Sequence, residues 1–214
     1  LASSAASDVY KRQIDANRIT AILNGGGYGK YITPSNEECK KIKKRFEIEA
    51  GPFFAYTGNI EPRKNIVTIL KAFEIACDRL DKTTSLVLAG KLSWRTQPII
   101  GAIEQNKYKD RIHLPGYISE EEKKYLMHNA CAFVFPSNYE GFGIPVVEAM
   151  SCGGIVITAD NSSLKEVGGK AAFYVQKTDE VSQLADRMVQ CFNLSDAERK
   201  KLTVDGESWA AQFS

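Results

Sequence analysis

The chain has 214 residues, enough for one domain with a well-buried core and too few for two domains of ordinary size. Its 28 Lys and Arg residues nearly balance 26 Asp and Glu residues, and the net charge of +2 argues against nucleic acid or an acidic membrane as the main partner. Five widely spaced cysteines without zinc-ligand spacing suit buried thiols, and no apolar run approaches the roughly 20 residues that span a bilayer, so we expect a cytoplasmic protein.

The first fifty residues do not read as the start of a domain. Residues 8–13 resemble the translation of a transposon end used to prepare sequencing libraries, so we expect residues 1–13 to be non-native. We assign residues 14–50 to the end of a missing N-terminal domain and an interdomain linker, with a strand at 18–23 before a glycine-rich joint. The chain also stops within a predicted helix, which predicts truncation at both ends.

From residue 51 onward, predicted strands and helices alternate. Short apolar runs rich in strand-forming residues predict six strands, at 53–57, 85–89, 111–114, 132–136, 155–158 and 171–175. Helical spacing of apolar residues and serine caps predict seven helices. One spans residues 96–107, two are marked by apolar stripes at 66–77 and 181–192, and four begin after Ser35, Ser119, Gly143 and Ser195. Regular alternation of this kind predicts an α/β domain over residues 51–214, with a doubly wound parallel sheet.

Two glutamates, Glu140 and Glu148, flank the predicted start of the helix that follows the fourth strand. Gly143 and Pro145 fit the cap and first position of this helix. A helix N-terminus favours an anion, whereas carboxylates accept hydrogen bonds from vicinal hydroxyls. The combination predicts a ligand with a diphosphate in its middle and a sugar at each end, which is a nucleotide sugar.

A second pair of charged residues, Arg63 and Lys64, follows the first predicted strand. Because the carboxyl ends of parallel strands share one edge of the sheet, both pairs are expected on the same side of the domain. Two adjacent cations suit a diphosphate and stabilise the charge that develops on a leaving nucleoside diphosphate. The alternative interpretation is a helix start with solvated charges.

Together these motifs resemble the nucleotide-sugar-binding domain of glycosyltransferase family four, whose members have two Rossmann-like halves in the GT-B architecture. Residues 58–64 are similar to that family's glycine, arginine and lysine loop, and 140–148 to its two glutamates separated by seven residues. Residues 88–90, 114–118 and 135–137 occur in the family's order and spacing. The resemblance implies the C-terminal, Rossmann-like half of a GT-B enzyme.

The resemblance also implies a role for each of these residues. Arg63 and Lys64 would contact the diphosphate, Glu140 would face the transferred sugar, and these three form the expected catalytic set. Glu148 would bind the ribose hydroxyls, Tyr117 and Ile118 would line the base, and backbone N–H groups of residues 142–144 would bind sugar or phosphate oxygens. The full implied substrate-binding set is Gly58, Gly90, Tyr117, Ile118, Ser137, Phe142, Gly143, Ile144 and Glu148.

Family membership of this kind implies metal-independent transfer of a hexose with retention at the anomeric carbon, in polysaccharide biosynthesis. The acceptor, a glycan or lipid-linked saccharide, would bind to the missing N-terminal half, so we expect this chain alone to be inactive. Residues 61–65 resemble bacterial mannosyltransferases and favour GDP-mannose as the donor, with UDP- and ADP-sugars left open and no other cofactor. The basic run at 40–46 predicts a solvated face or a peripheral contact at the inner membrane face.

Other nucleotide-binding classes fit less well. Gly141 and Gly143 lack the third glycine of a dinucleotide-binding turn, and a phosphate loop at 25–30 fails because Tyr31 replaces the Ser or Thr that would hold magnesium. Two alternatives stay open: a sugar-nucleotide epimerase or hydrolase of the same architecture, and a fragment that binds nucleotide without chemistry.

Overall fold

Six parallel strands form one sheet in the computed structural model, which describes residues 31–49, 51–80 and 83–213. The strands are β1 (Phe53–Thr57), β2 (Ser85–Ala89), β3 (Ile112–Gly116), β4 (Phe133–Phe135), β5 (Val156–Ala159) and β6 (Phe173–Val175). Their order across the sheet is β3-β2-β1-β4-β5-β6. The doubly wound α/β prediction is confirmed, whereas the expected non-native leader at 1–13 and the strand at 18–23 lie outside the described residues.

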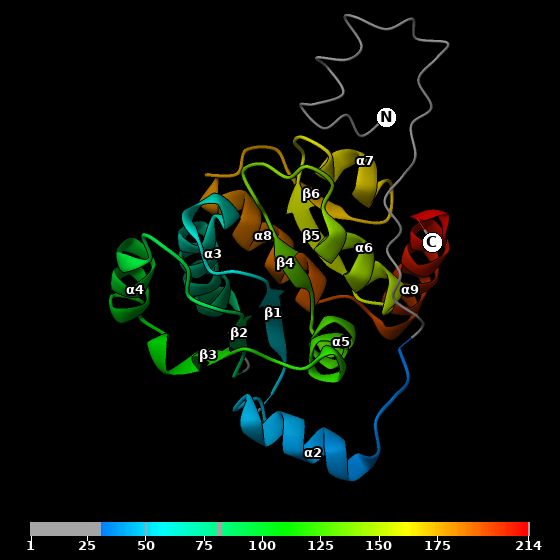
Figure 1. Cartoon of the computed structure of the whole chain (residues 1–214), viewed down its shortest axis with the longest axis horizontal. Helices are drawn as coiled ribbons and strands as arrows, with labels where there is room; N and C mark the ends of the chain where they lie inside the picture. Colours follow the sequence, from blue (N-terminus) through cyan, green and yellow to red (C-terminus); the bar gives the residue numbers. More distant parts are fainter. Residues whose placement is uncertain (1–30, 50, 81–82, 214) are drawn as a thin grey trace, which may run out of the picture.

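Helices cover both faces of the sheet (Figure 1). One layer contains α3 (Ile66–Arg79), α4 (Gln97–Glu104) and α8 (Val181–Phe192), with α3 in contact with the other two. In the opposite layer, α6 (Ile144–Ser151) contacts α5 (Glu120–Asn129), α7 (Leu164–Gly168) and α9 (Asp196–Ala210). The described residues also form three short 3-10 helices: η2 (Pro62–Lys64), η3 (Lys109–Arg111) and η4 (Ala211–Phe213).

The remaining helix, α2 (Asn36–Arg45), lies at the lower end of the domain in Figure 1. Its last residue, Arg45, forms an ion pair with Glu122 of α5 and donates a hydrogen bond of 3.0 Å to the carbonyl oxygen of Tyr117. These contacts tie the basic helix to the loop between β3 and α5. The capping boxes predicted at Ser35, Ser119 and Ser195 are all present.

The core lies on both sides of the central strands. Every residue of β1, β2, β4 and β5 is buried, as expected for parallel strands covered on two faces, while the edge strands β3 and β6 are partly exposed. The predicted apolar stripe of α3 is buried against this sheet. Hydrophobic burial on two faces therefore accounts for the near-continuous apolar runs that identified these strands.

The ends of β4, β5 and β6 differ from the predicted ranges by one or two residues, and three other elements differ for reasons that the structure shows. Helix α4 ends at Glu104 rather than at residue 107, because the chain turns at Asn106, whose buried amide donates to the Leu70 carbonyl oxygen at 2.9 Å. Strand β3 extends to Gly116 and includes Pro115, which an edge strand tolerates. The five-residue helix α7 was not predicted, since so short a segment shows no helical periodicity.

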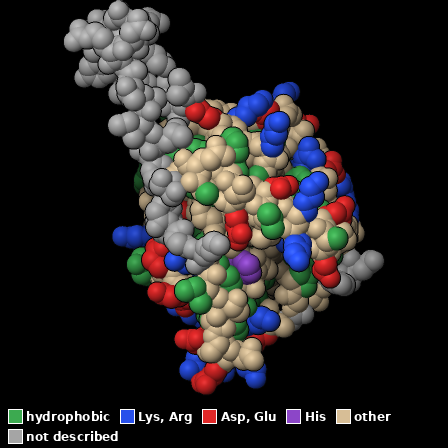
Figure 2. All heavy atoms as spheres, turned by 90° about the vertical axis from the view of Figure 1, so that its right-hand side faces the viewer, with side chains coloured by type: hydrophobic (Ala, Val, Ile, Leu, Met, Phe, Trp, Pro, Cys, Tyr) green, Lys and Arg blue, Asp and Glu red, His purple; other side chains and the backbone are tan. Residues whose placement is uncertain are grey.

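The cysteines are free thiols, and Cys77, Cys152 and Cys191 are buried as their apolar context predicted. Burial raises the pKa of the Cys77 and Cys152 thiols to about 11 and that of Cys191 to about 12, so all three are protonated and unreactive at neutral pH. Among the described residues, no helix is both long and apolar enough to cross a bilayer. Acidic and basic side chains are interspersed over the face drawn in Figure 2, in keeping with the balanced net charge.

The carboxyl ends of β1 and β2 approach each other at two glycines. Gly58 and Gly90 have φ angles of 136° and 144°, which side-chain-bearing residues rarely adopt. A Cβ atom on Gly90 would lie 1.8 Å from the carbonyl oxygen of Gly58. Backbone packing thus requires glycine at residue 90, and the predicted contact of both glycines with a substrate stays a prediction.

We predict that Gly90→Ala destabilises the protein, by about 1–3 kcal/mol from backbone strain alone and more from the clash with Gly58. Gly101→Ala is the matched control, because nothing lies within 4 Å of the added Cβ in α4 and alanine favours the helix by up to about 1 kcal/mol. Urea unfolding measures both changes. Equal stability of the two variants would contradict the close approach.

Candidate functional site

The two predicted charged motifs meet where the strand order reverses. From β1 the chain continues to β2 on one side of the sheet, and from β4 it continues to β5 on the other, so the loops after β1 and β4 face each other. The Asn138 N–H donates to the Arg63 carbonyl oxygen at 3.0 Å, and the Ser137 hydroxyl donates to the same oxygen at 3.2 Å. The loops after β1 and β4, which are far apart in the sequence, are therefore in direct contact at this edge of the sheet.

A tight turn directs the two cations toward the β4 loop. Pro62 occupies the start of η2, where its fixed φ angle suits the turn, and the turn ends at Asn65 with a left-handed φ of 60°. The Asn65 side chain donates to the carbonyl oxygens of Pro136 and Thr178 and accepts from the Thr68 hydroxyl. Asn65 thus joins the start of α3 to the loop that follows β4.

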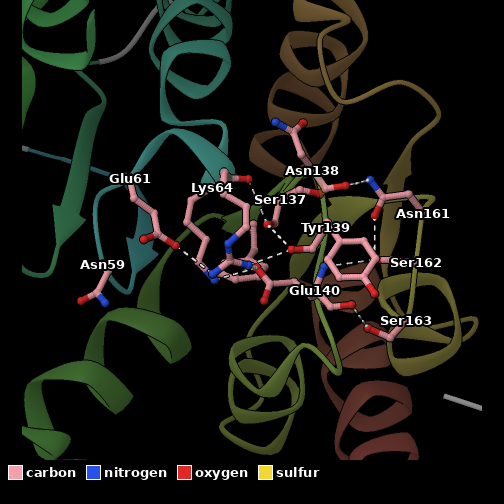
Figure 3. Close-up of polar contacts among 12 residues, drawn as sticks. Asn59, Glu61, Lys64, Ser137, Asn138, Tyr139, Glu140, Asn161, Ser162 and Ser163 are labelled. Atoms are coloured by element: carbon pink, nitrogen blue, oxygen red, sulfur yellow. Dashed lines mark hydrogen bonds and ion pairs between the residues drawn. The ribbon is translucent and has the colours of Figure 1, made fainter. Parts of the chain in front are cut away.

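Glu140 contacts both cations (Figure 3). Its Oε1 lies 2.6 Å from Lys64 Nζ and 3.0 Å from Arg63 Nη1, although 76 residues separate Lys64 from Glu140 in the chain. The side chains of Lys64 and Glu140 are each 11% exposed, whereas that of Arg63 is 47% exposed. Lys64 Nζ also lies 4.8 Å from the centre of the Phe135 ring, a favourable cation–π contact.

The remaining contacts of Arg63 balance the charge of this cluster. Arg63 Nη2 lies 2.8 Å from Glu61 Oε1, and Nη1 donates to the Tyr139 carbonyl oxygen at 2.8 Å. Two cations and two carboxylates therefore lie together. An anionic ligand that binds to Lys64 and Arg63 has to compete with Glu140 for them.

Opposing effects set the pKa of Glu140. Burial raises it, but hydrogen bonds from Lys64 and Ser137 and the charges of Lys64 and Arg63 outweigh burial, and the pKa lies below its usual value. Burial lowers the pKa of Arg63, but the nearby Glu140 and Glu61 raise it further, and the net shift is upward. Both side chains are charged at neutral pH.

Glu148 lies outside this cluster. It is the fifth residue of α6, near the helix start as predicted, and Oε1 of its buried side chain lies 3.3 Å from Lys123 Nζ of α5. Lys123 also lies 2.9 Å from Glu120 Oε2. Burial lowers the pKa of Lys123, but the two carboxylates raise it more, and the net shift is upward. Sequence analysis missed Lys123, because its partner Glu148 lies on a different helix.

Ser137 and Phe142 are engaged within the protein. The buried Ser137 hydroxyl lies within hydrogen-bond distance of the Arg63 and Tyr139 carbonyl oxygens, at 3.2 and 3.3 Å. The Phe142 ring packs edge-on against Phe213 at 5.7 Å between ring centroids. Their roles toward a ligand stay predictions, and for Phe142 only the backbone fits such a role.

The other predicted residues lie in the loops at the same edge. Tyr117, in the loop after β3, is 85% exposed, and Ile118 beside it is partly buried. Gly143 caps α6 with a φ angle of 102°, and Ile144 begins that helix with an exposed side chain. Phe142 and Gly143 are buried at this helix start, and the binding of sugar or phosphate oxygens by its N–H groups stays a prediction.

Other candidate sites are less well supported. In the described part of the chain, no group of three or more His, Cys, Asp or Glu side chains is arranged to hold a metal. A cavity of about 550 Å³ lies between α2 and α5 and contains none of the predicted site residues. The charged cluster at the carboxyl edge is the better candidate, because it joins two motifs predicted independently.

Comparison with known proteins places the chain among enzymes of sugar transfer. The family model described as glycosyl transferases group 1 matches residues 38–209. O-antigen chain mannosyltransferase B of Escherichia coli is 33% identical over 184 residues, which cover 86% of this chain and 48% of that protein. The GDP-mannose:cellobiosyl-diphosphopolyprenol alpha-mannosyltransferase of Xanthomonas oryzae pv. oryzae is 29% identical over 154 residues, covering 72% and 37%. The chain spans about half the length of these relatives or less.

Solved structures share the fold. A glycosyltransferase from Rickettsia africae superposes with a TM-score of 0.84 at 16% identity, covering 97% of this chain and 56% of that one. WaaG, a glycosyltransferase involved in lipopolysaccharide biosynthesis, gives a TM-score of 0.78 at 18% identity, covering 96% and 56%. HepE of Anabaena, in complex with UDP and glucose, gives 0.78 at 20% identity, covering 98% and 57%. These similarities establish the Rossmann-like GT-B fold.

We predict that Glu140→Gln lowers the free energy of unfolding at neutral pH by about 1–3 kcal/mol, because it leaves the buried Lys64 without a charged partner. Since the pKa of Glu140 is lowered in the folded state, its contribution is complete above the unfolded pKa of about 4.3 and is lost as pH falls through the folded-state pKa. Wild type and variant should therefore converge in acid.

Urea unfolding across this pH range measures the difference. Glu104→Gln, at an exposed carboxylate of α4, is the control and should change stability by less than about 0.5 kcal/mol. A difference between wild type and Glu140→Gln that does not change with pH would contradict the ion pair.

Proposed function

The chain belongs to the group 1 glycosyl transferases, and on that premise we propose that it binds a nucleoside diphosphate sugar at the edge where β1 and β4 end. The bound sugar, a hexose, would pass to an acceptor with retention at the anomeric carbon and without a metal ion. The proposal rests on the contact of one carboxylate, Glu140, with both Arg63 and Lys64. Two cations and a carboxylate at one point are the groups that a diphosphate and an adjoining sugar require.

In the proposed mechanism, the diphosphate takes the place of Glu140 beside Lys64 and Arg63. The N–H groups at the start of α6, around Gly143 and Ile144, add the positive end of the helix dipole. As the bond between sugar and phosphate breaks, these fixed groups stabilise the negative charge that develops on the leaving nucleoside diphosphate. Cationic side chains thereby supply the charge stabilisation for which other enzymes use a metal.

Glu140 and Glu148 have separate proposed tasks. Released from Lys64, Glu140 accepts hydrogen bonds from the hydroxyls of the transferred sugar. Glu148 stays paired with Lys123 and also accepts hydrogen bonds from the ribose hydroxyls, because an ionised carboxylate has about four acceptor sites. The exposed ring of Tyr117, with Ile118 beside it, provides an apolar surface for the base.

GDP-mannose is the proposed donor. Relatives named as mannosyltransferases support the sugar, and one of them is named for GDP-mannose. The HepE structure contains UDP and glucose on the same fold, so UDP-sugars are the alternative to test. One relative's name includes a diphosphopolyprenol-linked sugar, which supports a lipid-linked saccharide as acceptor and a peripheral place at the inner membrane face.

We further propose that residues 51–214 are the donor-binding domain and that 14–50 contain the end of another domain and a linker. The partial coverage of the relatives supports a further domain, and the family match over residues 38–209 includes most of 51–214 but also residues 38–50 of the proposed linker. Transfer would then need an acceptor-binding half, which closes over the donor and excludes water.

We predict that Arg63→Ala and Lys64→Ala each weaken GDP binding by about 10- to 100-fold, because each removes a charge-assisted contact of about 1.5–3 kcal/mol. Guanosine, which lacks phosphates, should bind nearly as before. Calorimetry with both ligands measures the contrast, with Lys71→Ala on an exposed part of α3 as the control. Equal weakening of GDP and guanosine would rule out the phosphate role.

A second prediction separates the glutamates. Glu148→Gln should weaken GDP and GDP-mannose to the same degree, because both contain the ribose. Glu140→Gln should lower the affinity for GDP-mannose relative to GDP, and GDP itself should bind at least as tightly because Lys64 and Arg63 are no longer paired with a carboxylate. Calorimetric titration of each variant that gives the opposite ranking would exchange the two roles.

A further inference from the structure

The loop between β5 and α7 holds the backbone of Glu140 on both sides (Figure 3). The Glu140 N–H donates to the Ser162 hydroxyl oxygen at 3.3 Å, and the Ser163 hydroxyl donates to the Glu140 carbonyl oxygen at 2.9 Å. Two consecutive hydroxyls thus engage both polar backbone groups of one residue. Sequence analysis assigned no function to this loop.

Asn161 extends the contact to the residues before Glu140. Its Nδ2 donates to the carbonyl oxygens of Ser137 and Asn138, at 3.2 and 3.1 Å. Its Oδ1 accepts from the Ser162 hydroxyl at 3.0 Å. Because that bond uses the single proton of the Ser162 hydroxyl, the oxygen of Ser162 is left to accept from Glu140. The donor and acceptor roles of Asn161, Ser162 and Glu140 in this network are therefore fixed.

The backbone of this loop is bent to make these contacts. Ser162 has a φ angle of 45°, in the left-handed region that non-glycine residues enter rarely and at a cost. The preceding strand, β5, pairs with β4 in parallel, with Phe135 opposite Thr158, so the two loops leave the sheet side by side. The strained residue lies where the loop contacts Glu140.

On its other side, the segment that carries Glu140 is bonded to the β1 loop. The Asn138 N–H donates to the Arg63 carbonyl oxygen, the Ser137 hydroxyl lies 3.2 Å from the same oxygen, and the Glu140 carboxylate contacts Lys64. Residues 137–140 are thus held between the loop that carries Lys64 and the loop at 161–163. This arrangement fixes the backbone of Glu140 and leaves its side chain to change partners.

We propose that Asn161, Ser162 and Ser163 are positioning residues, which hold the Glu140 backbone so that its carboxylate moves from Lys64 to the transferred sugar without displacement of the loop. The inference rests on the role of Glu140 in the proposed function. It adds that the position of this carboxylate is set from a third strand, β5, rather than by the β1 and β4 loops alone.

The first test needs no ligand. Amide hydrogen exchange is measured by NMR for wild type, Asn161→Ala and Ser163→Ala, with Ser182→Ala at an exposed position of α8 as the control. Asn161 does not bond to the Glu140 amide, yet its loss should speed exchange there and at Asn138 by at least about tenfold, while amides of β1 stay protected. Ser163→Ala should have the same effect at Glu140. Unchanged exchange at Glu140 in both variants would overturn the proposal.

The second test asks whether Asn161 acts through Glu140. Asn161→Ala should lower the ratio of GDP-mannose to GDP affinity by at least about threefold in the wild-type background and leave it unchanged in the Glu140→Gln background. The same loss in both backgrounds, or equal weakening of GDP and GDP-mannose, would show that Asn161 has only a structural role. If wild type binds no GDP-mannose, the proposed donor fails, and hydrogen exchange still decides the positioning role.

Discussion

The ion pair between Lys64 and Glu140 is the contact on which the site depends. Both side chains are largely buried, and a buried charge without its partner is costly, so each requires the other. Lys64 follows β1 and Glu140 follows β4, two neighbouring strands whose connections run in opposite directions. The sheet order therefore brings the two charges together. The ion pair in turn links the loop after β1 to the loop after β4.

In the proposed mechanism, this pair also determines how a donor binds. Before binding, Glu61 and Glu140 balance the charges of Arg63 and Lys64. A diphosphate that replaces Glu140 keeps the cations neutralised, and the released carboxylate can bond to hydroxyls of the adjoining sugar. In that exchange, hydrogen bonds from the sugar hydroxyls replace the ion pair of the released carboxylate, which offsets part of the cost of leaving a buried charge without a cation. Donor binding and the release of the proposed catalytic carboxylate would then be one event.

Local patterns in the sequence predicted the sheet and the edge that carries the candidate site. The features that the sequence did not predict depend on contacts between elements far apart in the chain. β1 and β2 match the predicted ranges because both faces of these strands are buried. The motifs around Lys64 and Glu140 identified the edge, since parallel strands share it. Neither the pairing of Lys123 with Glu148 nor the role of the loop at 161–163 was predicted. Contacts between side chains on separate helices or loops leave no regular pattern in the sequence. Hydroxyl and amide residues in a loop read as an ordinary turn.

In the proposed mechanism, the two glutamates use one kind of ion pair for two purposes. Each is a buried carboxylate paired with a lysine from a neighbouring element, Glu140 with Lys64 and Glu148 with Lys123. Lys64 has a second cation, Arg63, beside it, and Arg63 is nearly half exposed. A diphosphate can therefore bind first to Arg63 and then displace Glu140 from Lys64. Lys123, the partner of Glu148, lies between two carboxylates, which repel phosphate. In the proposed mechanism this pair therefore persists, and Glu148 is a fixed acceptor for the ribose hydroxyls.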